Sequence, residues 1–270
     1  MRASERREVI AEWAQSEGVN VEELSQRLGV SVSTIRRDLA LLTRNGRLMR
    51  TYGGAVGSPQ PEPSLHQREL VARPAKDAIG RAAAALVNPG ETVLIDAGTT
   101  AGRLAYHLRG MPDLTVITNG LTAVNMLADA DDVTVFMLGG QLRHISQGVI
   151  GPFADVMLRH FTATRAFLGA DGVVAGRGIC EAEPAQCALK EQMARHADEV
   201  YVLTDATKLG RAPFHFWAPL NRPWTLVTDE NATQDQLAPF RDAPGVTVMI
   251  APVQADAPNF GSGLRSVADA

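Results

Sequence analysis

Residues 30–50, VSVSTIRRDLALLTRNGRLMR, combine an apolar stripe with two adjacent arginines. At about 100° per residue, Ile35, Leu39 and Leu42 fall within a narrow arc on one side of a helix. The opposite side carries small and basic residues, namely Ser33, Arg36, Arg37, Ala40 and Arg44. The pattern therefore predicts a short helix with one buried face. Its basic face is either ordinary solvated surface or a contact for an anionic partner.

The segments on either side of this helix help to decide between the two. Residues 20–31, NVEELSQRLGVS, predict another short helix that ends at Gly29, and Ser31 is placed to cap the next one. Residues 4–18 predict a third helix, and GRLMRTYGGAV at 46–56 alternates basic with apolar residues, as a small β-wing does. Two helices joined by a tight turn form a helix-turn-helix. Three helices and a wing therefore predict a winged helix-turn-helix.

The stretch STIRRDLALLTRNGRLMRTYGGAV, residues 33–56, closely resembles the recognition helix and wing of the DeoR family of bacterial transcriptional regulators. The family pattern Thr-Ile-Arg-Arg-Asp-Leu falls at 34–39, and its Gly-Gly-Ala falls at 53–55. The resemblance implies a double-stranded DNA operator as partner, with this helix in the major groove, where arginine can bond guanine O6 and N7. The residues expected to contact DNA are Ser33, Thr34, Arg36, Arg37, Arg44, Arg47, Arg50 and Tyr52.

The distribution of charge fits a DNA-binding head on an acidic body. The whole chain has a net charge of −4, but residues 1–53 hold nine Lys and Arg against seven Asp and Glu. The remainder therefore carries −6, and such an asymmetry is typical of nucleic-acid-binding proteins. Because the head is only mildly basic, we expect affinity to need two or more heads. The predicted assembly is a homo-oligomer, a dimer or a tetramer.

The length of 270 residues predicts two domains. We expect the winged helix-turn-helix over 1–57, a semi-rigid proline-containing linker over 58–74, a larger domain over 75–252 and a disordered tail over 253–270. Two cysteines in a chain of this size favour a reducing cytoplasm. No signal peptide or transmembrane run is evident, so we expect a cytoplasmic protein without a membrane partner. The six histidines lack metal-ligand spacing and no nucleotide fingerprint is found, so neither metal nor cofactor is expected.

Beyond residue 75, strand-like and helix-like segments alternate, which predicts a mostly parallel sheet covered by helices and hence an α/β class for the body. The predicted strands are Thr92–Asp96, Thr115–Thr118, Val133–Leu138, Arg165–Ala170, Glu199–Thr204, Trp224–Thr228 and Thr247–Ala251.

Ligands of such sheets bind beyond the carboxyl ends of the strands, and five of these strands are followed by glycine-rich or polar turns. The first turn, DAGTT at 96–100, opens a helix and offers free amides and two hydroxyls to an anion. Alternatively, Thr99 or Thr100 simply caps that helix. Lys208, after the fifth strand, would pair with a phosphate.

The same segments, over about 75–230, resemble the DeoR-family sensor domain, whose fold is related to ribose-5-phosphate isomerase and glucosamine-6-phosphate deaminase. The resemblance implies a phosphorylated sugar as effector. It also implies a pocket formed by Asp96, Gly98, Thr99, Thr100, Asn119, Gly120, Gly139, Gly140, Asp171, Lys190, Asp205 and Lys208. We expect Glu183 to lie near this pocket as well. Two departures from the family bear on this pocket. Gly120 stands where members often have serine, and residues 176–193 lack the threonines of many members. Glu183 and Lys190 equally suit a solvated helix surface.

Three functions remain open at this stage. The first is a transcriptional regulator, a repressor of a carbohydrate catabolic operon. The second is an active sugar-phosphate isomerase or deaminase that carries a DNA-binding head, a possibility that Asp171 keeps open. Val173, however, stands where a deaminase typically has histidine, and a hydrophobic side chain cannot relay a proton. The third is a DNA-binding scaffold with a degenerate pocket, which the polar strand ends disfavour. We therefore predict a regulator and not an enzyme.

Overall fold

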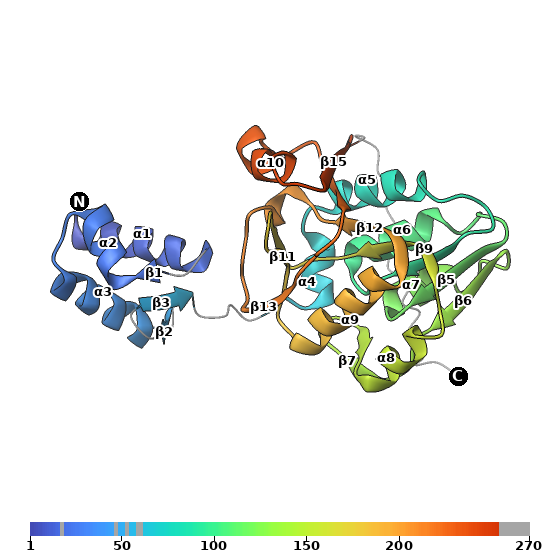
Figure 1. Cartoon of the computed structure of the whole chain (residues 1–270), viewed down its shortest axis with the longest axis horizontal. Helices are drawn as coiled ribbons and strands as arrows, with labels where there is room; N and C mark the ends of the chain where they lie inside the picture. The colour runs from blue at the N-terminus through green and yellow to red at the C-terminus, as the bar shows by residue number, and fades with distance from the viewer. Residues whose placement is uncertain (17–18, 46–47, 52–53, 58–61, 254–270) are drawn as a thin grey trace, which may run out of the picture.

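The computed structural model describes residues 1–16, 19–45, 48–51, 54–57 and 62–253. The N-terminal unit consists of three helices and a small antiparallel sheet of order β1-β3-β2 (Figure 1). Its elements are α1 (Ala3–Ser16), β1 (Val19–Asn20), α2 (Val21–Leu28), α3 (Val32–Arg44), β2 (Leu48–Thr51) and β3 (Gly54–Gly57). This is the predicted winged helix-turn-helix.

The core of the head follows the sequence pattern. Ile35, Leu39 and Leu42 of α3 are buried together with Ile10 of α1 and Leu24 of α2. α2 ends at Gly29, whose backbone is left-handed with φ of 64°. As predicted, Ser31 caps α3, because its side chain accepts a hydrogen bond from the amide of Thr34 at 3.3 Å. The basic face of α3 is thereby turned away from the core.

One buried charge in the head was not predicted. Asp38 of α3 is buried and forms an ion pair with Arg6 Nε of α1 at 2.7 Å. Arg7 Nε lies 3.8 Å from the same carboxylate. These contacts tie α1 to α3, so two of the head's arginines support the fold.

The body is built on a seven-stranded parallel sheet of order β15-β14-β12-β9-β4-β5-β6. All seven strands lie where the alternation predicted them, with ends shifted by one or two residues. Their bounds are β4 (Thr92–Ile95), β5 (Leu114–Thr118), β6 (Val133–Met137), β9 (Ala163–Leu168), β12 (Ala197–Leu203), β14 (Trp224–Asp229) and β15 (Val246–Ala251).

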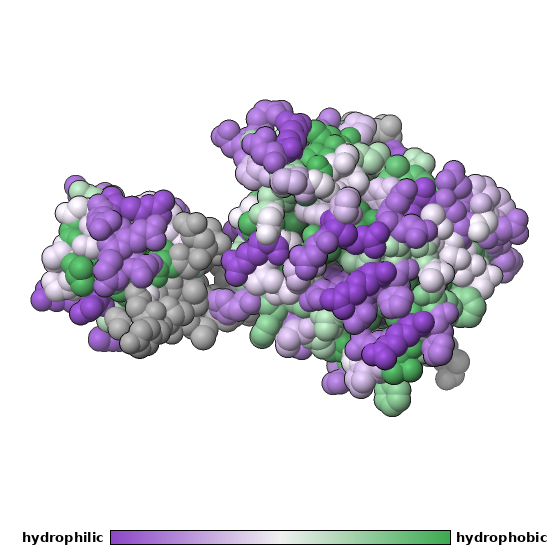
Figure 2. Space-filling view, in the orientation of Figure 1, coloured by the Kyte–Doolittle hydropathy of each residue, from purple (hydrophilic) through white to green (hydrophobic). Residues whose placement is uncertain are grey.

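Helices cover both faces of this sheet and give three layers (Figure 1). One face packs against α5 (Arg73–Ala84), α6 (Thr99–His107) and α7 (Leu121–Leu127). The other face packs against α8 (Pro152–Leu158), α9 (Pro184–Arg195) and α10 (Gln234–Arg241). Figure 2 shows the hydrophilic outer surfaces of α9 and α10. Because side chains from alternate strand positions enter the two layers, the central strands carry consecutive buried apolar residues, such as Val93, Leu94 and Ile95 of β4.

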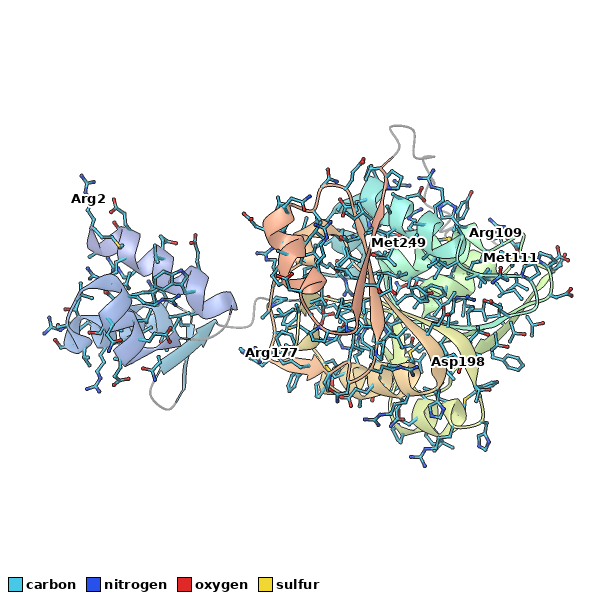
Figure 3. All side chains as sticks on the ribbon, turned by 45° about the horizontal axis from the view of Figure 1, so that its top comes forward. Arg2, Arg109, Met111, Arg177, Asp198 and Met249 are labelled. Atoms are coloured by element: carbon cyan, nitrogen blue, oxygen red, sulfur yellow. The ribbon has the colours of Figure 1, made fainter. Side chains whose placement is uncertain are left out.

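Short antiparallel elements are added to this frame. A hairpin pairs β7 (Gln141–Arg143) with β8 (Gly148–Ile150). A small sheet joins β10 (Gly172–Val174), β11 (Gly178–Glu181) and β13 (Phe216–Ala218). At its turn, the guanidinium carbon of Arg177 lies 3.9 Å from the centre of the Trp217 ring, and Arg177 projects from the surface (Figure 3). The sequence did not predict these strands, because three or four residues are too few to show an alternation of apolar and polar side chains.

The predicted linker over 58–74 contains a helix. Residues 58–61 lie outside the described residues, but α4 (Leu65–Leu70) and the start of α5 fall within this range. A capping box starts α4, because Ser64 accepts from the Gln67 amide and the Gln67 side chain accepts from the Ser64 amide. Polar contacts of Glu62, Leu65 and Arg68 with the body make this segment part of the larger domain. The tail predicted over 253–270 lies outside the described residues from 254 onward.

Candidate functional site

The basic face of α3 is solvent-exposed. Ser33, Arg36, Arg37 and Arg44 are exposed, whereas Thr34 is half-buried. The hydroxyls of Ser33 and Thr34 each lie 2.9 Å from the Ser31 hydroxyl, so both belong to the cap of the helix as well as to its surface. Of the three predicted wing residues, Arg47 and Tyr52 lie outside the described residues, as does the side chain of Arg50.

In the body, the predicted strand ends meet where the order of the strands reverses. The chain adds β5 and β6 on one side of β4, whereas β9, β12, β14 and β15 extend the sheet on the other side. Such a switch point opens a crevice at the carboxyl ends of the strands. Four consecutive strands, β12, β9, β4 and β5, end here and are followed within three residues by Asp205, Asp171, Asp96 and Asn119 respectively.

A buried lysine links three of the elements around this point. Lys190 of α9 forms ion pairs with Asp96, which follows β4, and with Glu181 of β11 at 3.1 Å. It also donates to the Gly169 carbonyl at 2.9 Å, and the Gly169 amide donates to Asp96 at 2.9 Å. Lys190 therefore lies beside the carboxyl ends of β4 and β9, and its ammonium group is committed to these partners.

The charges of this cluster depend on one another. Burial alone would lower the pKa of Lys190, but the carboxylates of Asp96 and Glu181 outweigh burial and raise that pKa above its ordinary value. Burial raises the pKa of Glu181 to about 8, with Lys190 opposing the shift and Asp171 and Asp96 adding to it. The cluster fixes β4, β9, β11 and α9 relative to one another at the carboxyl ends of the strands.

Three of the strand-end side chains hold buried oxygen atoms that make no hydrogen bond within the described part of the chain. They are Asn119 Oδ1, Asp171 Oδ2 and Asp205 Oδ2. All three atoms are acceptors. Two are carboxylate oxygens, and the third is the Asn119 amide oxygen, since the Asn119 amide nitrogen donates to the Val149 carbonyl at 3.2 Å. A buried acceptor without a donor costs on the order of 1–3 kcal/mol. A ligand rich in hydroxyl donors would satisfy these atoms.

Two lysines bring positive charge to the same strand ends. Lys208 Nζ donates to the carbonyl of Ala170, next to Asp171, at 2.6 Å. Lys76 of α5 is only 2% exposed, and burial, together with Lys208, Arg68 and Arg103, lowers its pKa to about 8, against the opposing effect of Asp205. Cations crowded in this way are stabilised by a bound anion.

Neither Lys76 nor Glu181 was predicted. Lys76 had a recognisable signal, because it falls on the apolar side of α5 beside Ala75 and Ile79, where an ordinary surface lysine would not. Glu181 had none, because a single carboxylate in a four-residue strand has no pattern to break.

Backbone geometry explains two of the predicted glycines. Gly98 precedes α6 with φ of 136°, a region that favours glycine, and no side chain caps this helix. The alternative in which Thr99 or Thr100 is the cap is therefore wrong; both lie inside the first turn, where the leading amides of α6 have no helical partner. At Gly120, a Cβ atom would lie 2.7 Å from the Ala97 Cα. The departure from serine at position 120 is thus required by close packing of the β5 turn on the β4 turn.

The profile of the DeoR C-terminal sensor domain matches residues 72–230, and that of the DeoR-like helix-turn-helix domain matches residues 6–60. The chain belongs to the DeoR family of transcriptional regulators. The resemblance seen in the recognition helix is confirmed, and it extends over nearly the whole chain.

Relatives of this DeoR-family regulator are named for control of transcription. A protein of Escherichia coli O157:H7, provisionally named as an aga operon transcriptional repressor, is 34% identical over 252 residues, which cover 92% of this chain and 93% of that protein. The transcriptional repressor GlcR of Bacillus subtilis strain 168 is 31% identical over 243 residues, covering 87% and 91% respectively. These relatives confirm the prediction of a regulator and not an enzyme.

Among solved structures, ribose 5-phosphate isomerase A from Methanocaldococcus jannaschii is similar to the DeoR-family regulator at 17% identity and a TM-score of 0.37, covering 49% of this chain and 52% of that one. A likeness at this level is distant. Across the described residues of the regulator, no helix is both long and apolar enough to cross a membrane.

The remaining predicted residues of the regulator have structural contacts. Gly139 and Gly140 follow β6, at the sheet edge two strands from β4, and a Cβ at Gly140 would lie 2.5 Å from the Ile150 carbonyl oxygen. Glu183 caps α9 by accepting from the Ala185 amide at 3.3 Å. Cys180 and Cys187 are buried and free, and burial raises the pKa of each thiol to about 12.

Proposed function

We propose that this regulator is a repressor of a carbohydrate catabolic operon and that its body binds a phosphorylated sugar as effector. One juxtaposition carries the proposal: unpaired buried acceptors and crowded lysines lie at the ends of four adjacent strands. The acceptors are Asn119 Oδ1, Asp171 Oδ2 and Asp205 Oδ2, and the lysines are Lys76 and Lys208. Sugar hydroxyls donate to such oxygens, and a phosphate pairs with such ammonium groups.

The first turn of α6 adds a second kind of anion contact. Its leading amides have no helical partners, and the positive end of the helix dipole lies at Gly98, Thr99 and Thr100. The names of the relatives support sugar control, since one is named for the aga operon and another is GlcR. We place Asp96 and Lys190 beneath the ligand as its rigid floor, because their charges already neutralise each other.

Binding in this pocket is proposed to occur without turnover. Isomerisation or deamination needs a positioned acid and base. Val173, which stands where a deaminase typically has histidine, is an apolar side chain with no exposed surface, in β10. The pocket can therefore bind a sugar phosphate while lacking the proton carrier.

The head is proposed to bind operator DNA through the exposed face of α3 and the wing. The proposed contacts are Ser33, Thr34, Arg36, Arg37, Arg44, Arg47, Arg50 and Tyr52. Because paired half-sites match a two-fold symmetric protein, we propose that the regulator is at least a dimer. Effector binding would then shift the population of the DNA-competent state by its differential affinity for the two states. Light scattering of the full chain tests the assembly, and a monomer that binds its operator tightly would contradict it.

A ligand screen tests the effector. Full-length protein is heated with glucose 6-phosphate, glucosamine 6-phosphate, fructose 6-phosphate or ribose 5-phosphate, and in parallel with each unphosphorylated sugar. At least one phosphorylated sugar should raise the melting temperature and alter DNA affinity in a gel-shift titration, while its unphosphorylated counterpart should do neither. An equal response to the phosphate-free sugar, or steady isomerisation or ammonia release, would refute the proposal.

A further inference from the structure

The segment that enters the body from the head is anchored by polar contacts. Glu62 forms a two-pronged ion pair with Arg143, one bond of which measures 2.8 Å. The Leu65 amide and Arg68 Nη2 both donate to the Ile145 carbonyl, each at 3.1 Å. These bonds fasten α4 to the β7–β8 connection, so the position of the entering chain is fixed by the body.

Arg68 belongs to both this anchor and the pocket. Its Nη1 atom lies 3.2 Å from Asp171 Oδ1 at the end of β9 and 3.6 Å from Glu62 Oε1 in the entering segment. The side chains of Arg68, Asp171 and Glu62 are only 14%, 8% and 7% exposed. Water therefore screens these charges weakly, and the loss of either carboxylate partner would be costly for the arginine.

A lysine of the proposed pocket also contacts the C-terminal end of α4. Lys76 Nζ donates to the carbonyls of Arg68 and Val71, the latter at 2.7 Å. Lys76 is one of the two lysines whose charges crowd the strand ends. An anion that attracted Lys76 would compete with the last carbonyls of α4 for the same ammonium group.

We propose that Arg68 is a positioning residue that couples the effector pocket to the DNA-binding head, through the exchange of its partner Asp171 between the arginine and the bound ligand. The inference rests on the proposed function for the identity of the ligand. Asp171 has one oxygen on Arg68 and one without a hydrogen-bond partner. A ligand hydroxyl that donates to this carboxylate changes what Arg68 can gain there. The arginine retains Glu62, so α4 and the entering segment have two arrangements that the ligand can bias.

A ligand-free measurement tests this coupling directly. A DNA fragment is selected from a random pool with full-length protein, and its Kd is measured by fluorescence anisotropy. Arg68→Gln should weaken DNA binding about tenfold, in the range of ordinary coupling free energies, and Arg68→Lys should restore most of the affinity. Asp171→Asn should act similarly, and the double variant should be no weaker than either single variant, because both remove one shared contact.

A matched control separates coupling from stability. Arg222 is also a partly buried arginine, and it donates to the carbonyls of Ala194, Ala197 and Asp198, none of them near α4. Arg222→Gln should leave DNA affinity unchanged even where it lowers the melting temperature. A second readout is the ratio of the DNA Kd measured with the effective sugar phosphate to the DNA Kd measured without it. Arg68→Gln should bring this ratio close to one. Loss of stability alone would not produce that effect.

The outcomes distinguish this inference from the proposed function. Wild-type DNA affinity in folded Arg68→Gln, or fully additive effects of the 68 and 171 variants, would overturn the coupling. If a sugar phosphate binds and Arg68→Gln retains the full response, the function stands and the coupling fails. If no sugar phosphate of the panel binds but the two variants are non-additive, the coupling is supported and the effector proposal fails.

Discussion

The head and the body both offer positive charge to phosphate, but they do so in opposite surroundings. On α3, Arg36, Arg37 and Arg44 are exposed, whereas Lys76 in the body is buried beneath α4 and shares its surroundings with Lys208. Exposed charges are screened by salt over about 10 Å at 0.1 M ionic strength, and buried ones are screened far less. The first arrangement suits a long polyanion that approaches from solvent. The second suits a single small anion held out of water.

Salt should separate the two sites most strongly. With about seven phosphate contacts from two heads, DNA affinity should fall about 10⁴-fold between 50 and 200 mM KCl, because bound cations are released from DNA. Effector affinity, measured by calorimetry over the same range, should change much less, since Lys76 is buried and Lys208 is half-buried. Parallel salt dependences would show that the body's site is as exposed as the head's.

Removal of one arginine should affect only the head. Arg37→Ala should weaken operator binding by about 1–3 kcal/mol if the side chain contacts a base. The effector-induced shift in melting temperature should stay unchanged. Arg2→Ala is the matched control. Arg2 precedes the N-terminal end of α1 and projects into solvent (Figure 3), so this substitution should not alter DNA affinity. A folded Arg37→Ala protein with wild-type affinity in a gel-shift titration would refute this role.

The converse variant should affect only the body. Thr100→Val combined with Lys208→Ala removes a hydroxyl and a charge from the pocket and should weaken the sugar phosphate at least about tenfold, since bonds to charged groups contribute on the order of 1.5–3 kcal/mol. DNA affinity without ligand should be retained. Arg241→Ala, an exposed change on α10, serves as the control. Loss of DNA binding in the pocket variant would mean that it damages the fold.

A smaller effect is expected from pH. In the free protein the pKa of Lys76 is lowered to about 8, chiefly by burial. A bound phosphate would raise that pKa, so binding near pH 8 should take up protons. Effector affinity should therefore fall about fivefold from pH 8 to pH 9 and change little from this group below pH 7, where Lys76 is protonated in both states.

Calorimetry in buffers of different ionisation enthalpy measures the proton uptake directly. Lys76→Gln should abolish it, and the head's arginines should keep DNA affinity constant over this window because they remain charged. Uptake that persists in Lys76→Gln would assign the titration to another group.

The two regions also differ in how well sequence predicts them. The α3 helix and the seven strands follow from periodicity, because Ile35, Leu39 and Leu42 share one face and buried parallel strands form apolar runs. The strand-end residues Asp96, Asn119, Asp171 and Asp205 were predictable from the rule for open sheets. Local patterns therefore identify the frame and most of the candidate pocket.

What sequence did not predict depends on contacts between distant residues. Asp38 pairs with Arg6 from another helix, and Glu181 and Asp96 meet on Lys190 only after the sheet has formed. Arg68 was hidden in a segment that its prolines marked as a linker, and its partner Asp171 is 103 residues away. Such pairings leave no spacing in a single sequence, because neither partner breaks a local pattern.

The two native thiols bear on how motions between head and body can be observed. Cys180 and Cys187 are buried, and at pH 7 their raised pKa values of about 12 leave almost no thiolate to react. They are also the only cysteines in the chain. A cysteine engineered on the exposed surface of α3, paired with one on α9, would thus accept maleimide dyes without removal of the native pair. Single-molecule energy transfer could then follow domain movement in otherwise unmodified protein.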